Sequence, residues 1–256
     1  NDTPVAFTLN ETTPEDVSLT IDLSATDVDH NIHSYSDFSF VITSIDICGT
    51  LQDPSNPSLD ISSESGPYTL VGHRVVYIPP LNFSSTNETF SYHVVDAGGL
   101  SSEDVSVNII VIAQNDTPVA FTLNETTPED ISLTIDLSAT DVDHNIHSYS
   151  DFSFIITSID ICGTLQDPLN PSSDISSESG PYTLLGHRVV YIPPLNFSSA
   201  NESFIYHVVD AGGLSSEDVS VNITVIAQND TPVAFTLTET TPEDISLTID
   251  LSATDV

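Results

Sequence analysis

Alternating carboxylates are the residues of this sequence with the clearest capacity for chemistry. Asp27 and Asp29 are separated by one valine, and Asp141 and Asp143 repeat the arrangement. An Asp-x-Asp pattern on a loop places both carboxylates on one side of the chain, a geometry that hard cations such as Ca²⁺ use. The pattern is equally typical of turns in a solvated acidic chain, so the spacing alone leaves both interpretations open.

Further oxygen-bearing side chains stand where predicted strands begin or end. Glu15 precedes a strand, Asp96 ends another beside two glycines, and Asn115 and Asp116 open the four-residue segment Asn-Asp-Thr-Pro. In an end-to-end array of β-sandwiches, the loops of one domain face those of the next. Unbalanced carboxylates crowded there are costly, and Ca²⁺ with six to eight oxygen ligands would relieve that cost.

The Asn-Asp-Thr-Pro segment begins at residues 1, 115 and 229, which gives a repeat length of 114 residues. We expect one repeat at 1–114, a second at 115–228 and the start of a third at 229–256, in a segment of a longer protein. The Asn-Asp-Thr-Pro segment is the joint between one repeat and the next. It contains no glycine, and its proline keeps the backbone extended, which predicts a stiff joint. The first two repeats differ only at nine pairs of positions, 17/131, 41/155, 55/169, 59/173, 71/185, 86/200, 89/203, 91/205 and 110/224.

The chain is strongly acidic, with 38 Asp and Glu against 2 Lys and Arg and a formal net charge of −36. Such a surface repels nucleic acid and anionic membranes, so both are excluded as partners. No apolar run is long enough to insert into a membrane. The charge also repels itself, which favours bound cations, while a 39% hydrophobic content argues against disorder.

Each repeat holds one cysteine, Cys48 or Cys162, so no disulfide can form within a repeat. One interpretation is a small buried hydrophobic residue at a strand end. The other is a disulfide to a neighbouring chain.

Sequons for N-glycosylation are frequent and, with the high acidity and scarce lysine, favour a secreted, extracellular or cell-surface protein that carries glycans. The joint asparagines are weak sequons because proline follows the threonine. The remaining sequons lie at Asn10, Asn82, Asn87, Asn124, Asn196, Asn201 and Asn222.

The elements that must position these side chains are strands. Alternating apolar residues and regular turn signals predict about seven strands per repeat and no amphipathic helix. We expect a turn from residue 49, a polar loop over 53–67 and a hairpin between 68–71 and 74–78. The other predicted strands of the first repeat span 5–9, 18–23, 38–47, 90–95 and 105–112. The fold class is therefore all-β, with tandem Greek-key β-sandwiches.

Several of these stretches resemble a known family. Residues 25–31 resemble the A-T-D-x-D stretch of cadherin repeats, residues 92–99 resemble their last-but-one strand, and residues 115–118 resemble a shortened cadherin linker. The resemblance is closest to the cadherin-like tandem repeats of large extracellular surface proteins, and five short motifs occur in the same order.

The resemblance implies a cadherin-like or Ig-like sandwich with Ca²⁺ at the joints. The implied ligands are Glu15, Asn115, Asp116, Asp141, Asp143 and Asp210 at the first joint and Glu129, Asn229, Asp230 and Asp255 at the second. Asp27, Asp29 and Asp96, the counterparts in the first repeat of Asp141, Asp143 and Asp210, are implied ligands as well.

Two departures from the family pattern reduce the expected number of ions. The Asp-Arg-Glu motif is missing, with only Glu88 and Glu202 nearby, and Ala113 and Ala227 stand where a cadherin linker supplies its first aspartate. We therefore expect one or two Ca²⁺ per joint rather than three.

The sequence predicts no enzyme. The histidines at 30, 33, 73 and 93 lack zinc-ligand spacing, and Gly98-Gly99 is not part of a nucleophile elbow. Two hypotheses remain: a calcium-stiffened rod or stalk for adhesion or surface projection, and the shaft subunit of an extracellular filament with lateral chain–chain contacts. In both, the partners are other copies of the repeat or of the same protein. A carbohydrate-binding module ranks last because tryptophan is absent.

Overall fold

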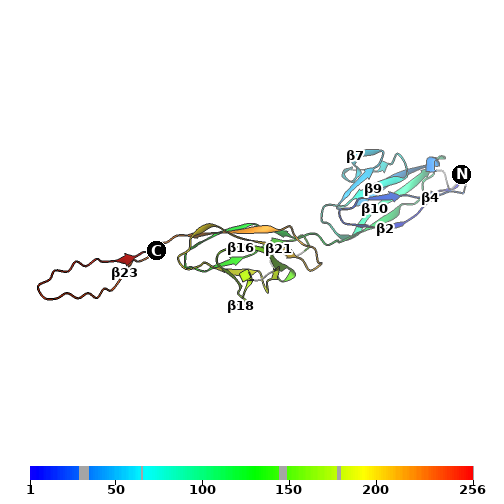
Figure 1. The fold of residues 1–256 in the computed structure, drawn as a ribbon. Coiled ribbons are helices and arrows are strands. Elements are labelled where there is room, and N and C mark those ends of the chain that lie inside the picture. The colour runs from blue at the N-terminus through cyan, green and yellow to red at the C-terminus, as the bar shows by residue number, and fades with distance from the viewer. Residues whose placement is uncertain (29–34, 65, 144–148, 178–179, 256) are drawn as a thin grey trace. The chain divides into compact units, whose positions relative to one another are not determined.

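The computed structural model describes residues 1–28, 35–64, 66–143, 149–177 and 180–255. The chain divides into two units, residues 1–114 and residues 115–256 (Figure 1). In the described part of the chain, no helix has the length and apolar character needed to cross a membrane.

The described residues of unit 1 form strands and two single-turn 3₁₀ helices. Its strands are β1 (Val5–Ala6), β2 (Leu9–Pro14), β3 (Leu19–Asp22), β4 (Ala25–Thr26), β5 (Phe38–Asp46), β6 (Thr50–Asp53), β7 (Asn56–Asp60), β8 (Tyr68–Thr69), β9 (Arg74–Ile78), β10 (Ser85–Asp96) and β11 (Val105–Ile112), and its helices are η1 (Tyr35–Asp37) and η2 (Ile61–Ser63).

Unit 2 repeats this order. Its strands are β12 (Val119–Ala120), β13 (Leu123–Pro128), β14 (Leu133–Asp136), β15 (Ala139–Thr140), β16 (Ser153–Asp160), β17 (Thr164–Asp167), β18 (Asn170–Asp174), β19 (Tyr182–Thr183), β20 (Arg188–Ile192), β21 (Ser199–Val209), β22 (Val219–Ile226), β23 (Val233–Ala234) and β24 (Ala253–Thr254), and its helices are η3 (Tyr149–Asp151) and η4 (Ile175–Ser177).

Each unit is a sandwich of two sheets. In unit 1 a five-stranded sheet has the order β2-β11-β10-β5-β8, a four-stranded sheet has the order β3-β9-β6-β7, and β1 pairs with β4. The pairing of β2 with β11 is parallel, and the other pairs are antiparallel. Unit 2 has the equivalent sheets β13-β22-β21-β16-β19 and β14-β20-β17-β18, with β12 on β15. The predicted all-β sandwich is confirmed.

The core forms because alternate residues of both sheets are apolar and face each other. In unit 1, Phe40, Phe90 and Tyr92 of the five-stranded sheet are buried with Ile21 and Tyr77 of the four-stranded sheet. This strand alternation is the pattern that places one face of a sheet in the core and the other in solvent.

Tyr92, a buried residue of β10, also holds two loops in place at one end of the sandwich. The Tyr92 hydroxyl oxygen lies 2.8 Å from the Phe7 carbonyl oxygen and 3.0 Å from the Ser24 carbonyl oxygen, so either carbonyl can accept its proton. The Tyr206 hydroxyl contacts the equivalent carbonyls in unit 2, those of Phe121 and Ser138. A buried tyrosine hydroxyl needs such partners, and here they hold the backbone three residues before Asp27 and Asp141.

Several strand predictions are confirmed and some are wrong. The strand predicted over 105–112 is β11, and that over 38–47 is β5. The predicted hairpin between 68–71 and 74–78 is wrong, because β8 pairs with β5 while β9 pairs with β3 and β6 in the other sheet. The chain crosses between the two sheets at this point.

The turn predicted from residue 49 and the loop predicted over 53–67 are also partly wrong. Strand β6 begins at Thr50, and β7 lies within the predicted loop. Asp53 holds this region together, since its buried carboxylate accepts hydrogen bonds from the backbone of Ser55 and Val71, each at 2.8 Å. The segment is therefore largely exposed, as predicted, but it contains a strand and is anchored by a buried aspartate.

Candidate functional site

Asp210 binds the side chain of Asn115, the first predicted ligand residue of unit 2. It follows β21, and Gly213, with φ of 91°, turns the chain so that the Leu214 amide donates to Asp210 Oδ1 at 2.8 Å. The Asn115 side chain donates from Nδ2 to Asp210 Oδ2 at 2.7 Å. Burial opposes ionisation of this carboxylate, yet its pKa is lowered, because the Asn115 amide and the backbone N–H groups of the turn donate to it.

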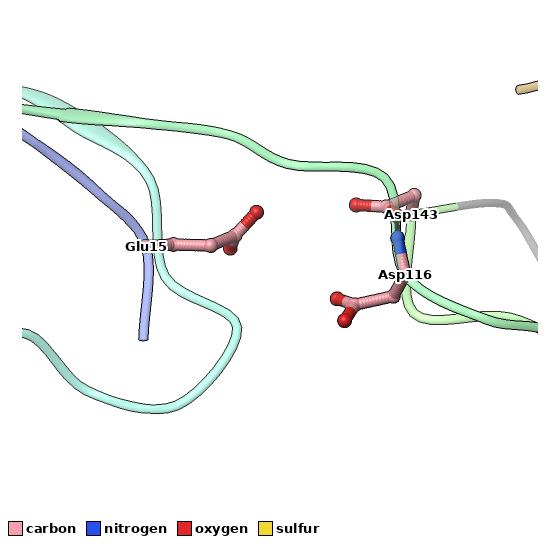
Figure 2. A group of neighbouring side chains, drawn as sticks. All are labelled: Glu15, Asp116 and Asp143. Carbon is pink, nitrogen blue, oxygen red and sulfur yellow. Dashed lines mark hydrogen bonds between the residues drawn. The ribbon is translucent and has the colours of Figure 1, made fainter. Parts of the chain in front are cut away.

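Asp116, Asp141 and Asp143 form a chain of contacts at the same end of unit 2. The Asp116 amide donates to Asp143 Oδ2 at 2.7 Å, and the Asp143 amide donates to Asp141 Oδ1 at 3.0 Å. Asp141 is buried directly after β15. Figure 2 shows the carboxylates of Asp116 and Asp143 projecting to the same side of the segments that carry them. Asp143 of the Asp-x-Asp pattern thus binds the backbone of Asp116, a residue of the Asn-Asp-Thr-Pro segment.

Gly212 is required by the position of Asn115. A Cβ added at Gly212 would collide with the Asn115 side chain, and one at Gly98 would collide with Asn1 in the same way. The first glycine of the Gly-Gly pair therefore lets the joint asparagine reach the aspartate, while the second supplies the positive φ of the turn.

In unit 1, Asp96 makes the same contacts as Asp210 does in unit 2. Asn1 Nδ2 donates to Asp96 Oδ2 at 2.9 Å, and the Leu100 amide donates to Asp96 Oδ1 at 2.9 Å. Asp27 and Asp96 are both buried. The pKa of Asp96 is lowered despite the opposing effect of burial, because Leu100 and Asn1 donate hydrogen bonds to it. Asp29 lies outside the described residues.

Glu15 and Glu129 lie where the chain leaves each unit. The amide of Glu15 donates to the Ile112 carbonyl at 2.9 Å, and the amide of Gln114 donates to Glu15 Oε1 at 2.5 Å. Parallel pairing causes this, since it sets Pro14 beside Ile112. The same bonds join Glu129 to Ile226 and Gln228 in unit 2, and both glutamates are buried. Figure 2 includes Glu15.

The predicted ligands in residues 229–255 are not brought together in the same way. Asn229 and Asp255 are exposed, and Asn229 Nδ2 donates to the Asp230 carbonyl at 3.1 Å. Among the described residues no hydrogen bond joins Asn229 or Asp230 to Asp255. No counterpart of Asp210 exists in residues 229–256.

Glu88 and Glu202 have a structural role that the sequence reasoning missed. Glu88 is buried and accepts hydrogen bonds from the Cys48 amide at 2.6 Å and from the Tyr77 hydroxyl at 3.4 Å. Burial, together with this carboxylate, raises the pKa of Tyr77. The signal was present in the alternation of β10, where Glu88 shares the inward phase of Phe90 and Tyr92.

Cys48 and Cys162 are free and exposed, so the interpretation as buried hydrophobic residues is wrong. The reason is that β5 ends at Asp46 and β16 at Asp160, before the alternation reaches the cysteines. A disulfide to another chain stays a prediction.

Histidines in the described residues make structural contacts. His73 stacks on Tyr35 with ring centroids 4.0 Å apart and lies 3.4 Å from Asp22, which also binds Arg74 at 2.6 Å. His93 Nδ1 lies 3.0 Å from Asp104. His30 and His33 lie outside the described residues.

Comparisons with known proteins address the fold. Residues 1–109 match the Bacterial Ig domain family. No curated protein sequence matches the chain. The human protocadherin-24 EC1-2 structure is 15% identical with a TM-score of 0.50, and the match covers 89% of this chain and 100% of that one.

Two other solved structures are matched over only part of their length. The human desmocollin-1 ectodomain is 12% identical with a TM-score of 0.41, and the match covers 91% of this chain and 42% of that one. The endo-fucoidan hydrolase MfFcnA4 from glycoside hydrolase family 107 is 17% identical with a TM-score of 0.30, and the coverage is 88% and 29%. This chain therefore spans less than half of either protein. Taken with the two sandwich units, the family match over residues 1–109 and the likeness to the protocadherin-24 structure show an Ig-like, cadherin-like fold in tandem repeats.

Proposed function

We propose that this chain is an extracellular structural repeat protein whose joints are stiffened by Ca²⁺, forming a rod or stalk for adhesion or surface projection. The observation that carries the proposal is the gathering of five oxygen-bearing side chains at the start of unit 2. They are Asn115, Asp116, Asp141, Asp143 and Asp210.

The chemistry of these donors fits calcium. Carboxylate and amide oxygens are the ligands that Ca²⁺ takes, and the five side chains contain no sulfur or imidazole group. Three of the four carboxylates belong to residues linked by hydrogen bonds: the Asp116 amide donates to the Asp143 carboxylate, and the Asp143 amide donates to the Asp141 carboxylate. Like charges held this closely oppose one another, and a divalent cation removes that opposition. The same residue types recur at the start of unit 1, which supports a repeated role.

Glu15 is held at the point where the chain leaves unit 1. Its side chain is bound to the backbone of Gln114, which is the residue before Asn115. We propose that Glu15 shares an ion with the donors of unit 2, and that Glu129 serves the following joint together with Asn229, Asp230 and Asp255. Bound calcium would also offset part of the net charge of −36. Extracellular calcium modules bind at about 10⁻⁴ to 10⁻³ M, a range suited to this partly exposed set.

The test is thermal and urea unfolding of the 256-residue chain in Ca²⁺ and in chelator, with the particle length measured by small-angle scattering. At ten times Kd, one bound ion adds about 1.4 kcal/mol to the free energy of unfolding. We expect that gain and a longer, stiffer particle. Asp143→Asn, which removes one carboxylate, should reduce the gain, while Asp160→Asn at the exposed end of β16 should leave it unchanged. An identical response of all three proteins would overturn the calcium assignment.

A second candidate function is the shaft subunit of a filament with lateral contacts between copies of the chain. The exposed thiols of Cys48 and Cys162 favour it, because an exposed free thiol can pair with another chain. Non-reducing electrophoresis of the native assembly distinguishes the two. Thiol-sensitive multimers that disappear in a Cys48→Ser, Cys162→Ser protein would support the filament, and a monomer under oxidising conditions would count against cross-linking.

A further inference from the structure

The outer face of the five-stranded sheet is the set of residues on β2, β11, β10 and β5 that alternate with the core residues. In unit 1 this face holds Asn10 of β2, Asn108 and Ile110 of β11, and Asn87 and Thr89 of β10, among others. The register sets Asn10 beside Asn108, and Asn108 beside Thr89, so these residues form one continuous surface.

This face is unusually poor in charge for such an acidic chain. Of the carboxylates in residues 1–114, the four strands contribute only Asp46 to the outer face, and the loop before β11 adds Asp104, which binds His93. In unit 2 the strands contribute only Asp160. The other outward positions are mostly serine, threonine, asparagine and aliphatic residues, with one histidine per unit, His93 or His207.

Five of the seven sequons lie on this outer face, and each of the five asparagines is exposed. The two others, at Asn82 and Asn196, lie in the loop that follows β9 or β20. The five are Asn10 on β2, Asn87 on β10, Asn124 on β13, Asn201 on β21 and Asn222 on β22.

Differences between the two repeats preserve or extend these sequons. Thr89 is replaced by Ser203, which keeps the hydroxyl residue that the sequons of Asn87 and Asn201 require. Ile110 is replaced by Thr224, which creates the sequon of Asn222. Among the differing positions on this face, none removes a sequon from the second repeat.

We propose that the outer face of the five-stranded sheet is a glycan-bearing face, with N-linked oligosaccharides at Asn10 and Asn87 in unit 1 and at Asn124 and Asn201 in unit 2. The inference rests on the extracellular location in the proposed function. The co-reactant is a lipid-pyrophosphate-linked oligosaccharide, presented to the extended chain by a transferase. The amide nitrogen of asparagine attacks the anomeric carbon, a C–N bond forms, the C–O bond to pyrophosphate breaks, and the amide loses one proton.

A glycan on Asn222 and a glycan on Asn124 would occupy the same space. The two residues are opposite each other on parallel neighbouring strands, which lie about 4.8 Å apart. Asn222 Nδ2 donates to Asn124 Oδ1 at 2.9 Å, so the nitrogen of Asn124 stays available on the edge strand. Two glycans at this spacing would clash, and we expect one, on Asn124.

A glycan-bearing outer face would also restrict assembly. Bulky, hydrated oligosaccharides cover the surface that carries them. Lateral contacts between copies would then have to use the four-stranded sheet or the sandwich edges.

The experiment is peptide mapping by mass spectrometry of the full chain secreted from a eukaryotic cell, before and after removal of N-glycans by an amidase that converts the modified asparagine to aspartate. We expect conversion at Asn10, Asn87, Asn124 and Asn201. Thr12→Ala should abolish conversion at Asn10 alone, and Thr20→Ala, outside any sequon, should change nothing.

The two proposals fail differently in this experiment. Conversion only at the loop residues Asn82 and Asn196 would overturn the glycan-bearing face while leaving the extracellular rod intact. Conversion at none of the seven sites in the secreted protein would overturn the glycan-bearing face and leave the calcium response as the independent test of the rod. Conversion at Asn222 in place of Asn124 would overturn the assignment within the pair.

Discussion

Residues 115–142 and residues 229–256 have nearly the same sequence and very different structures. They differ at one position, Asn124 against Thr238. In the first segment Leu137 is fully buried, with 0% of its side chain exposed, whereas its counterpart Leu251 is 87% exposed. Strands β13 and β14 of the first segment have no counterpart in the second, and only the small pair β12–β15 recurs, as β23–β24.

The difference shows what makes a strand in this protein. Strand β13 pairs with β22 and β14 pairs with β20, and both partners come from later parts of the repeat. Residues 229–256 contain no counterpart of β20 or β22. A local sequence of alternating residues is therefore insufficient, because the strands are stabilised by distant pairing and by burial of their apolar face.

Supplying the missing partners should give the largest effect. We predict that a copy of residues 143–228 added after residue 256 will fold the third repeat completely. Amide hydrogen exchange at Leu247–Asp250 should slow by roughly 10³-fold or more, since opening would then cost several kcal/mol. Exchange that stays fast would mean that pairing partners are not what distinguishes the two segments.

A matched pair of core substitutions should give the next largest effect. Leu137→Ala leaves a cavity in the core of unit 2 and should cost about 2–5 kcal/mol of the free energy of unfolding. Leu251→Ala, the same change in the same local sequence, should cost less than about 0.5 kcal/mol. Urea unfolding followed by circular dichroism measures both. Equal costs would show that Leu251 is packed in solution.

The smallest effect should come from the joint asparagines. Asn115→Ala removes the donor to Asp210 and should cost at most about 1 kcal/mol, because Asn115 is exposed and the hydrogen bond is only partly buried. Asn229→Ala should cost nothing measurable, since residues 229–256 hold no counterpart of Asp210.

The cost of Asn115→Ala has a defined pH dependence. Since the folded-state pKa of Asp210 is lowered, its ionised form contributes stability above the unfolded-state pKa of about 3.9, and that contribution is lost as the pH falls through the lower folded-state value. Wild type and variant should therefore differ at pH 7 and converge in acid. A difference that is constant from pH 7 to pH 2 would exclude the carboxylate as the partner.

Much of the fold could be predicted because alternation and turn residues are local signals. The β11 strand and the Asp96–Gly99 turn were found this way, and the positive φ of Gly99 agrees with the turn. The partners of β8 and β9 could not be predicted, because pairing depends on contacts between residues far apart in sequence. The same limit explains why β6, which pairs with β9, was not predicted as a strand.

The predicted ligand residues show the same division. Asp141 and Asp143 were found from their spacing, and the structure joins them to Asp116 by backbone hydrogen bonds. The contact between Asn115 and Asp210 spans 95 residues and depends on the absence of a side chain at Gly212. Two consecutive glycines indicated a tight turn, but they carried no signal that the first is needed for packing rather than for backbone conformation.

The parallel pairing of β2 with β11 has a mechanical consequence. These neighbouring strands are the first long strand and the last strand of the unit, and their register runs from Leu9 beside Val107 to Pro14 beside Ile112. Tension that pulls the two ends of a repeat apart draws these strands in opposite directions along their own axes. The hydrogen bonds between them are then loaded in shear and must break together rather than one after another, so each repeat resists extension at the place where the force enters and leaves.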